Sequence, residues 1–169
     1  ILPGNNTSPG AANDLFGQGD LDIVLANWNG LNQVWANNGG FWLQTQALAS
    51  STTHDVALGD LDGDGDLDLF AVNGGSDKIF LNDGTGQFTA TAQNLSSLRG
   101  MNAALGDIDS DGDLDAFVVN TSGGAEEIWA NDGAGNFSLL QSLAGGDSNE
   151  VALGDLDGDG DLDAIVTNA

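Results

Sequence analysis

The sequence contains no cysteine, only two prolines and only two basic residues among its 169 residues. Without cysteine, neither disulfide bonds nor thiolate metal sites can hold the fold. No apolar run reaches the 18 residues of a membrane-spanning helix, so we expect no membrane insertion. No signal peptide is visible, and because the chain begins at Ile1 we expect it to be a processed form or a fragment.

Positive charge is almost absent from this chain. Lys78 and Arg99 stand against 26 acidic side chains, and the formal net charge is −24. Such a charge repels phosphate backbones and anionic lipid surfaces, so we do not expect nucleic acid or membranes as partners. Crowded carboxylates also oppose compaction unless cations neutralise some of them.

The chain has enough apolar residues to fold as one domain over residues 1–169. Hydrophobic residues make up 40% of the sequence, and 26 glycines indicate a fold rich in turns. No stretch shows sustained helical periodicity, so we expect short β-strands joined by tight turns.

One segment recurs along the chain. ALGDLDGDGDLD at residues 57–68 returns as ALGDIDSDGDLD at 104–115 and as ALGDLDGDGDLD at 152–163. A weaker copy, DLFGQGDLD, occupies residues 14–22. The four units start at Asp14, Asp60, Asp107 and Asp155, which places them 46, 47 and 48 residues apart. A period of this length is typical of repeat architectures.

The sequence predicts four strands in each of the first three units. Apolar runs at 69–72 and 79–81 correspond to runs at 116–119 and 128–130, and the turns NDGTGQF (82–88) and NDGAGNF (131–137) follow. Asn and Gly in these turns supply the left-handed backbone of a tight hairpin. Four strands per unit favour a β-propeller blade, because a β-helix would need nine-residue repeats and a sandwich would not repeat its loops so closely. The predicted blades are 11–49, 55–97, 102–144 and an incomplete 150–169.

The predicted array of about three and a half blades is open. The fourth unit holds only two strands before Ala169. We expect either that the chain is a piece of a longer protein or that a second copy forms a homo-oligomer that completes the propeller.

The loop between the first two strands of each full unit reads D-x-D-x-D-G-D-L-D. Calcium prefers six to eight hard oxygen ligands, and alternating carboxylates on a loop folded by Gly can converge on one ion. We expect side-chain oxygens from the first, third, fifth and ninth positions, with the seventh giving its carbonyl and pointing its side chain outward. The sequence thus predicts three calcium ions, held by Asp60, Asp62, Asp64, Asp66 and Asp68; by Asp107, Asp109, Asp111, Asp113 and Asp115; and by Asp155, Asp157, Asp159, Asp161 and Asp163.

Other interpretations of these loops are weaker. Solvated acidic turns without metal would leave carboxylates that repel by about 4 kcal/mol per pair at 4 Å and an effective dielectric near 20. Magnesium prefers small octahedral sites that keep several waters. An EF-hand needs an acid at the twelfth position, where this chain has Ala71, Val118 and Val166. In the first unit, Phe16 and Gln18 replace two ligands, so we predict that this loop binds no calcium.

These loops, turns and spacings resemble the FG-GAP or VCBS repeats of integrin-α-like β-propellers. The resemblance covers the chain from Asp14 onward, although the first loop and the turn NNGGF (37–41) depart from the pattern. It implies propellers of about seven blades, secreted or on cell surfaces, that act as adhesion, lectin-like or scaffold modules.

Function is expected on the face opposite the acidic loops, where the loops joining strands two and three and those joining blade to blade lie. Trp28, His54 and Arg99 are candidate contacts for a glycan or protein ligand. Trp35 and Trp129 align with Phe80 and are expected in the core.

We expect an extracellular binding platform without enzymatic activity, since one histidine and no cysteine leave little catalytic material. Two alternatives are a propeller-based polysaccharide lyase or hydrolase, which would use Glu126, Glu127 or Glu150, and a structural spacer of a larger surface protein.

Overall fold

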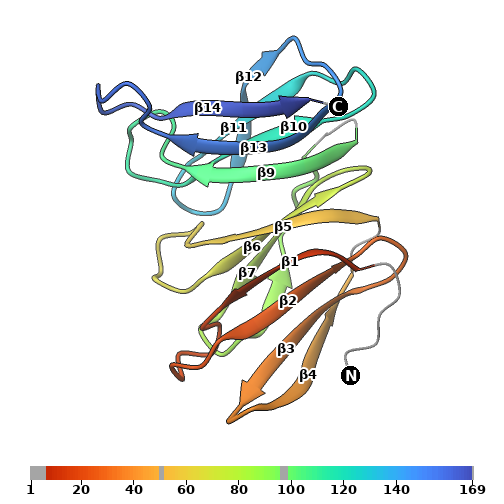
Figure 1. Cartoon of the computed structure of the whole chain (residues 1–169). Helices are drawn as coiled ribbons and strands as arrows, with labels where there is room; N and C mark the ends of the chain where they lie inside the picture. The colour runs from red at the N-terminus through yellow and green to blue at the C-terminus, as the bar shows by residue number, and fades with distance from the viewer. Residues whose placement is uncertain (1–6, 50–51, 96–98, 169) are drawn as a thin grey trace.

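The computed structural model describes residues 7–49, 52–95 and 99–168, which form fourteen β-strands and no helix (Figure 1). No helix in these ranges could therefore cross a membrane. The strands form three antiparallel sheets of four strands and one of two, and the described sheets do not close into a ring. The predicted all-β fold of about three and a half blades is confirmed.

Each sheet is a simple meander in which neighbours along the chain pair with each other. The first two sheets contain β1 (Thr7–Asn13), β2 (Asp22–Asn27), β3 (Asn32–Asn38), β4 (Phe41–Leu48), β5 (Thr53–Gly59), β6 (Asp68–Asn73), β7 (Lys78–Asn82) and β8 (Phe88–Ala90). The others contain β9 (Gly100–Gly106), β10 (Asp115–Asn120), β11 (Glu126–Asn131), β12 (Phe137–Leu143), β13 (Ser148–Gly154) and β14 (Asp163–Asn168).

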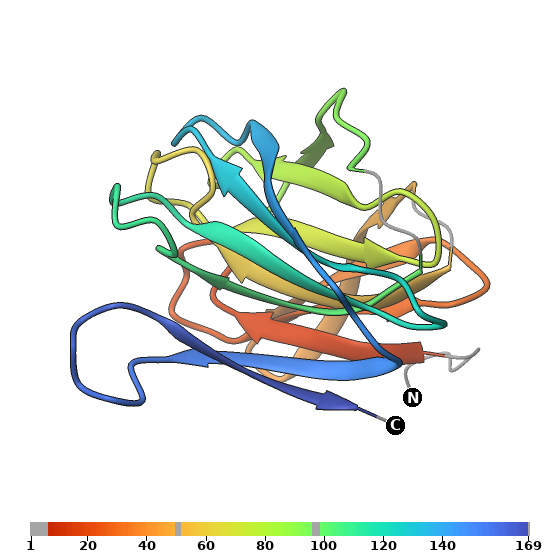
Figure 2. The same ribbon diagram turned by 90° about the horizontal axis from the view of Figure 1, so that it is seen from above.

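The sheets are arranged like successive blades of a propeller. Strands β1, β5, β9 and β13 contact one another in series, whereas β4 and β12 lie outermost in their sheets. The acidic loops, each between the first and second strands of a sheet, therefore lie together at the left of Figure 1. Figure 2 shows them on one side again when the molecule is seen from above.

The core lies between the sheets. Strands β6 and β10 are buried along their whole length, as continuous apolar runs require. One hydrophobic cluster lies between each pair of adjacent sheets, and Phe70 meets Phe137 edge to face at 5.5 Å across the second boundary. Trp129 is buried there, as predicted, whereas Trp35 is only half-buried.

Polar side chains also join adjacent sheets at repeated positions. The Gln46 side chain accepts from the Phe88 N–H at 2.9 Å and donates to its carbonyl at 2.7 Å, and Gln93 does the same with Phe137 at 3.0 and 3.4 Å. These paired bonds provide partners for the backbone N–H and carbonyl groups of Phe88 and Phe137, which burial would otherwise leave without hydrogen bonds.

Candidate metal centres and the opposite face

The acidic loops have one backbone shape. In the second sheet, the Asp60 carboxylate accepts from the N–H groups of Gly63 (2.9 Å) and Gly65 (3.0 Å). Both glycines have left-handed φ angles of 77° and 93°, which strain other residues. The third loop places Ser110 in the first of these positions at φ 64°, so the turn survives one departure from glycine.

The ninth aspartate anchors each loop to the sheet. The buried Asp68 carboxylate accepts from Leu61 N and from Asn82 N, each at 2.8 Å, and so holds the loop and the start of the next turn. Each oxygen keeps a further lone pair for a cation. The same loop contact recurs at Asp22, Asp115 and Asp163.

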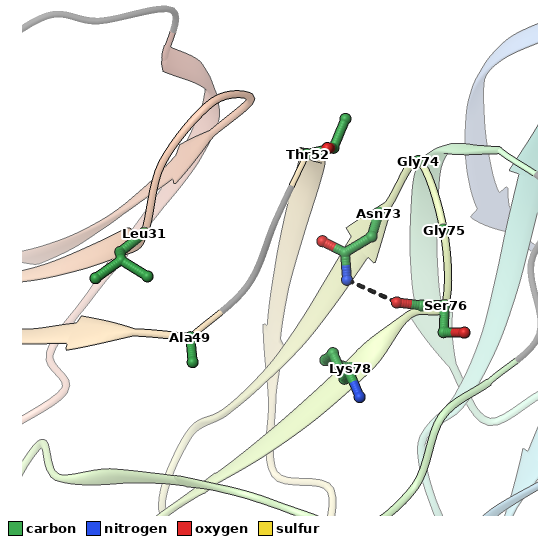
Figure 3. A pocket seen from close by; sticks show the side chains of 8 residues that line it. All are labelled: Leu31, Ala49, Thr52, Asn73, Gly74, Gly75, Ser76 and Lys78. Carbon is green, nitrogen blue, oxygen red and sulfur yellow. Dashed lines mark hydrogen bonds between the residues drawn. The ribbon is translucent and has the colours of Figure 1, made fainter.

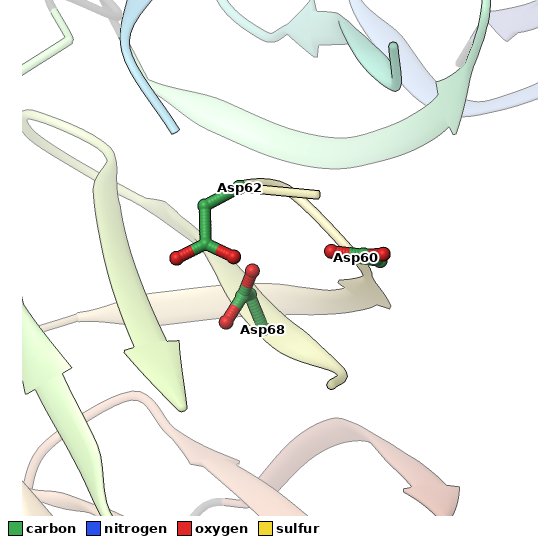
Figure 4. Close-up of side chains that lie close together, drawn as sticks. All are labelled: Asp60, Asp62 and Asp68. Atoms are coloured by element: carbon green, nitrogen blue, oxygen red, sulfur yellow. The ribbon is translucent and has the colours of Figure 1, made fainter. Parts of the chain in front are cut away.

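Three clusters of carboxylates lie at the loops of the described chain. Oxygens of Asp60, Asp62 and Asp68 lie within 4.8 Å of one another (Figure 4). The equivalent clusters contain Asp107, Asp109 and Asp115, and Asp155, Asp157 and Asp163. Each combines the first, third and ninth positions of its loop, and this hard-oxygen donor set suits a divalent cation.

Burial makes two carboxylates of the second sheet's cluster, Asp68 and Asp62, harder to ionise. Burial is the main cause that raises the pKa of Asp68 from 3.8 to about 6, and the charges of Asp62 and Asp64 add to it. Burial also raises the pKa of Asp62, with Asp64 and Asp60 contributing. A cation at the cluster would reverse both effects, so the residues fit a metal ion.

The fifth and seventh positions lie outside these clusters. The Asp64 carboxylate accepts from Asp66 N at 2.9 Å, and Asp111 and Asp159 make the same contact with Asp113 and Asp161. The Asp66 side chain was predicted to point outward. It instead lies half-buried against Gly84 in the β7–β8 turn, where that glycine leaves room for it.

The first loop keeps the turn but replaces its acids. Asp14 accepts from Gln18 N (2.9 Å) and Gly19 N (2.7 Å), as Asp107 does from Asp111 N and Gly112 N in its own loop. The Phe16 ring lies over Gly86 in the turn of the next sheet and packs on the first hydrophobic cluster. The apolar contact of Phe16 thus occupies the third position of the loop, where the other acidic loops have a carboxylate. The prediction that this loop binds no calcium stays a prediction.

Restoring the acids should add a metal site to the first loop. We expect the double variant Phe16→Asp and Gln18→Asp to bind one more calcium ion than the wild-type chain in a calorimetric titration. The loop already has the required turn and the anchoring Asp22. The control Phe16→Ser and Gln18→Ser loses the same packing without gaining carboxylates. Equal stoichiometry in both variants would contradict the ligand assignment.

The raised pKa of Asp68 predicts how metal-free stability depends on pH. The folded chain binds this proton more tightly than the unfolded chain, so stability should fall as pH rises from about 4 to 6. Below about pH 4 the lowered pKa values of Asp83 and Asp132, caused by hydrogen bonds within their turns, act in the opposite direction. Denaturant titrations in chelator should show the fall, and Asp68→Asn should reduce it. An unchanged slope would contradict this cause.

The structure brings two of the three predicted ligand-contact residues together. Trp28, 52% exposed, meets the His54 ring edge to face at 5.2 Å. The His54 Nδ1 donates to the Gly100 carbonyl at 2.6 Å. Arg99 lies beside this carbonyl in sequence but extends to the Ser122 hydroxyl at 3.0 Å.

Two acids on this side of the molecule are buried. Asp55 accepts from the Asn102 side chain at 2.6 Å, between β5 and β9. Glu126 accepts from Asn120 N (2.7 Å) and from the Ser148 hydroxyl (2.5 Å). Both carboxylates therefore hold the sheets together, and Glu126 has little capacity left for acid–base chemistry.

Sequence reasoning missed the asparagine that opens each β-hairpin turn. Asn131 Nδ2 donates to the carbonyl of Leu61 in the preceding acidic loop (2.8 Å) and to Leu114 in its own (3.2 Å). Asn82 bridges Leu15 and Leu67 in the same way, at 3.3 and 3.2 Å. Only the repeated N-D-G sequence hinted at a shared role.

Sequence reasoning also missed two pockets beside the β2–β3 loop. One of about 450 Å³ lies between the first two sheets (Figure 3). The other, of about 300 Å³, runs along the first sheet, and Leu31 lines both.

The repeated four-stranded sheets define a propeller-type repeat protein, and the acidic loops at their first turns could hold metal ions. An FG-GAP-like repeat profile matches the chain three times, at residues 14–71, 60–118 and 107–166. These matches cover most of the sequence, and the chain belongs to the FG-GAP-like repeat family.

Comparison with solved structures shows the same fold in a larger protein. A chain in the Photorhabdus luminescens Tc holotoxin pore superposes with a TM-score of 0.52 and 20% sequence identity. The match covers 93% of this chain but only 8% of the toxin chain. Among curated proteins no relative is found.

Proposed function

We propose that this chain is a calcium-binding propeller module in which one ion occupies each of the three acidic clusters. The observation that carries the proposal is the repeated meeting of a backbone-anchored aspartate with two further carboxylates within 4.8 Å. The bound ion would supply positive charge where the loop concentrates negative charge. The first, third, fifth and ninth side chains and the seventh carbonyl would hold it.

Calcium in this position would have a structural role. Each cluster joins the end of the first strand to the start of the second, and its ninth aspartate also bonds to the β-hairpin turn in the second and third sheets. Neutralising the cluster therefore fixes three segments of a blade together. Fixed blades would present the loops of the opposite face as a rigid platform for a glycan or protein ligand.

We place this module outside the cell or on its surface, without catalytic activity. Loops that are largely exposed suit the weak calcium affinities typical of extracellular modules, where the ion is abundant. The engagement of Glu126 in structural hydrogen bonds supports a binding role over acid–base catalysis.

Calorimetric titration tests the calcium sites directly. We expect three ions per chain and the loss of one ion for each of the single variants Asp62→Asn, Asp109→Asn and Asp157→Asn. Asp20→Asn is the control, because it removes an acid from the first loop and should leave three ions. A wild-type chain that binds no calcium, or third-position variants that keep full stoichiometry, would refute the proposal.

A further inference from the structure

The β2–β3 loop and the boundary between the first two sheets form a polar groove on the face opposite the acidic loops. Asn27, Asn29 and Gln44 line its smaller pocket, and Thr52, Asn73 and Ser76 line the larger one. Leu31, 51% exposed, is shared by both. Their volumes of about 300 and 450 Å³ fall in the range of small-molecule sites, roughly 300–1,000 Å³.

The groove differs from the rest of the molecule in its charge. None of the described residues that line either pocket is acidic, although the chain has 26 acidic side chains. Apart from Lys78, the polar side chains that line the pockets carry amides or hydroxyls, and Asn29, Gln44 and Ser76 among them are exposed. Amides offer both donors and acceptors, which matches the hydroxyl groups of a sugar.

An exposed aromatic residue is linked to this groove through His54, whose ring lies beside Gly74 of the larger pocket. Trp28 lies between Asn27 and Asn29 in the chain and is 52% exposed. Its edge-to-face contact with His54, itself bonded to Gly100, fixes the ring before any ligand arrives. A large ring already held in place can cover the apolar face of a sugar at little cost in conformational entropy.

The charge of the whole chain selects against acidic ligands. Lys78 lines the larger pocket, but its ammonium group donates to the Asn94 side chain. A single lysine does not offset a net charge of −24, so an anionic ligand would be repelled on approach. Neutral ligands with many hydroxyl groups carry no such penalty.

We propose that this groove, the Trp28 groove, binds an uncharged oligosaccharide, with Trp28 covering one sugar ring and the amides of Asn29 and Gln44 contacting hydroxyl groups. The proposal rests on the platform role proposed above and names its ligand class. It assigns the site to the boundary of the first two sheets, on the face opposite the acidic loops.

The test uses the full chain saturated with calcium and five neutral probes: cellohexaose, xylohexaose, mannohexaose, laminarihexaose and maltohexaose. Binding is followed by tryptophan fluorescence and calorimetry. At least one probe is expected to bind, and Trp28→Ala should weaken it about tenfold or more, whereas Trp28→Phe should keep most of the affinity. Trp42→Ala is the matched control, because Trp42 is 41% exposed but lies at the opposite end of its sheet.

The outcomes separate this proposal from the calcium proposal. Calcium stoichiometry and circular dichroism are measured on every variant, so a folding defect is recognised and Trp28→Phe then serves as the test. If no neutral probe binds while three calcium ions still do, the groove proposal is overturned and a protein ligand remains for this face. Equal weakening by Trp28→Ala and Trp42→Ala, or tighter binding of hexagalacturonate than of every neutral probe, also overturns it.

Discussion

Calcium is expected to raise the free energy of unfolding by about 2.7 kcal/mol per site when its free concentration is 100 times the dissociation constant. With three equivalent sites the total approaches about 8 kcal/mol, provided that the blades unfold together. The physical reason is that the folded loops gather carboxylates that the unfolded chain keeps apart. Denaturant titrations with calcium and with chelator measure the difference.

Variants of the third aspartates give the control for this result. We expect each single variant to lose one site's share of the calcium-dependent increase in the free energy of unfolding: Asp62→Asn, Asp109→Asn or Asp157→Asn. In chelator, each variant should have nearly the stability of the wild-type chain. Magnesium at the same concentration should stabilise less, because it resists losing its waters. A stability that does not change between calcium and chelator would rule out a structural role for the ion.

The second large effect is expected from the aspartate that anchors each loop. Asp22→Ala in the first sheet should lower the free energy of unfolding by about 3 kcal/mol, with or without calcium. Leu15 N and Asn37 N, each 2.9 Å from the Asp22 carboxylate, both lose a charged acceptor. Asp68→Ala loses the matching pair of bonds and a metal ligand as well. In calcium it should therefore cost more than Asp22→Ala, by about the stabilisation of one site.

Chelation should reverse the order of these two variants. Removing Asp68 also relieves the cost of burying its charge and its repulsion with Asp62 and Asp64, which together raise its pKa in the metal-free chain. In chelator Asp68→Ala is therefore expected to cost no more than Asp22→Ala. Unfolding curves of both variants under both conditions decide the point, and identical costs in calcium would mean that Asp68 binds no metal.

Much of the fold could be predicted because its information is local and repeated. The runs at 69–72 and 116–119 became the buried strands β6 and β10, and the N-D-G turns became hairpins. Acidic loops that alternate carboxylates with glycine place their first, third and ninth residues in one cluster by backbone geometry alone. Because the sequence of the loop repeats, the same cluster forms in every full unit.

Contacts between units could not be predicted in the same way. Gly86 faces Phe16, and Asp55 faces Asn102, from positions more than 40 residues away in the sequence. Asp55 and Glu126 are acids whose burial depends in part on contacts with the neighbouring sheet, at Asn102 and Ser148. The same reason hid the pocket at Leu31, whose other wall belongs to the next sheet.

The asparagine bridges connect the second and third sheets each to the acidic loop of the sheet before it. Asn131 in the third sheet is tied to Leu61, a residue of the second acidic loop, whereas Asn82 in the second sheet is tied to Leu15, beside the Phe16 contact. The second blade therefore rests on apolar packing by the first loop, whereas the third rests on a loop whose acidic cluster we propose binds calcium. Under this proposal, a fall in calcium concentration would disorder the blades at the carboxyl-terminal end first. The calcium concentration would then determine how many blades along the chain stay ordered.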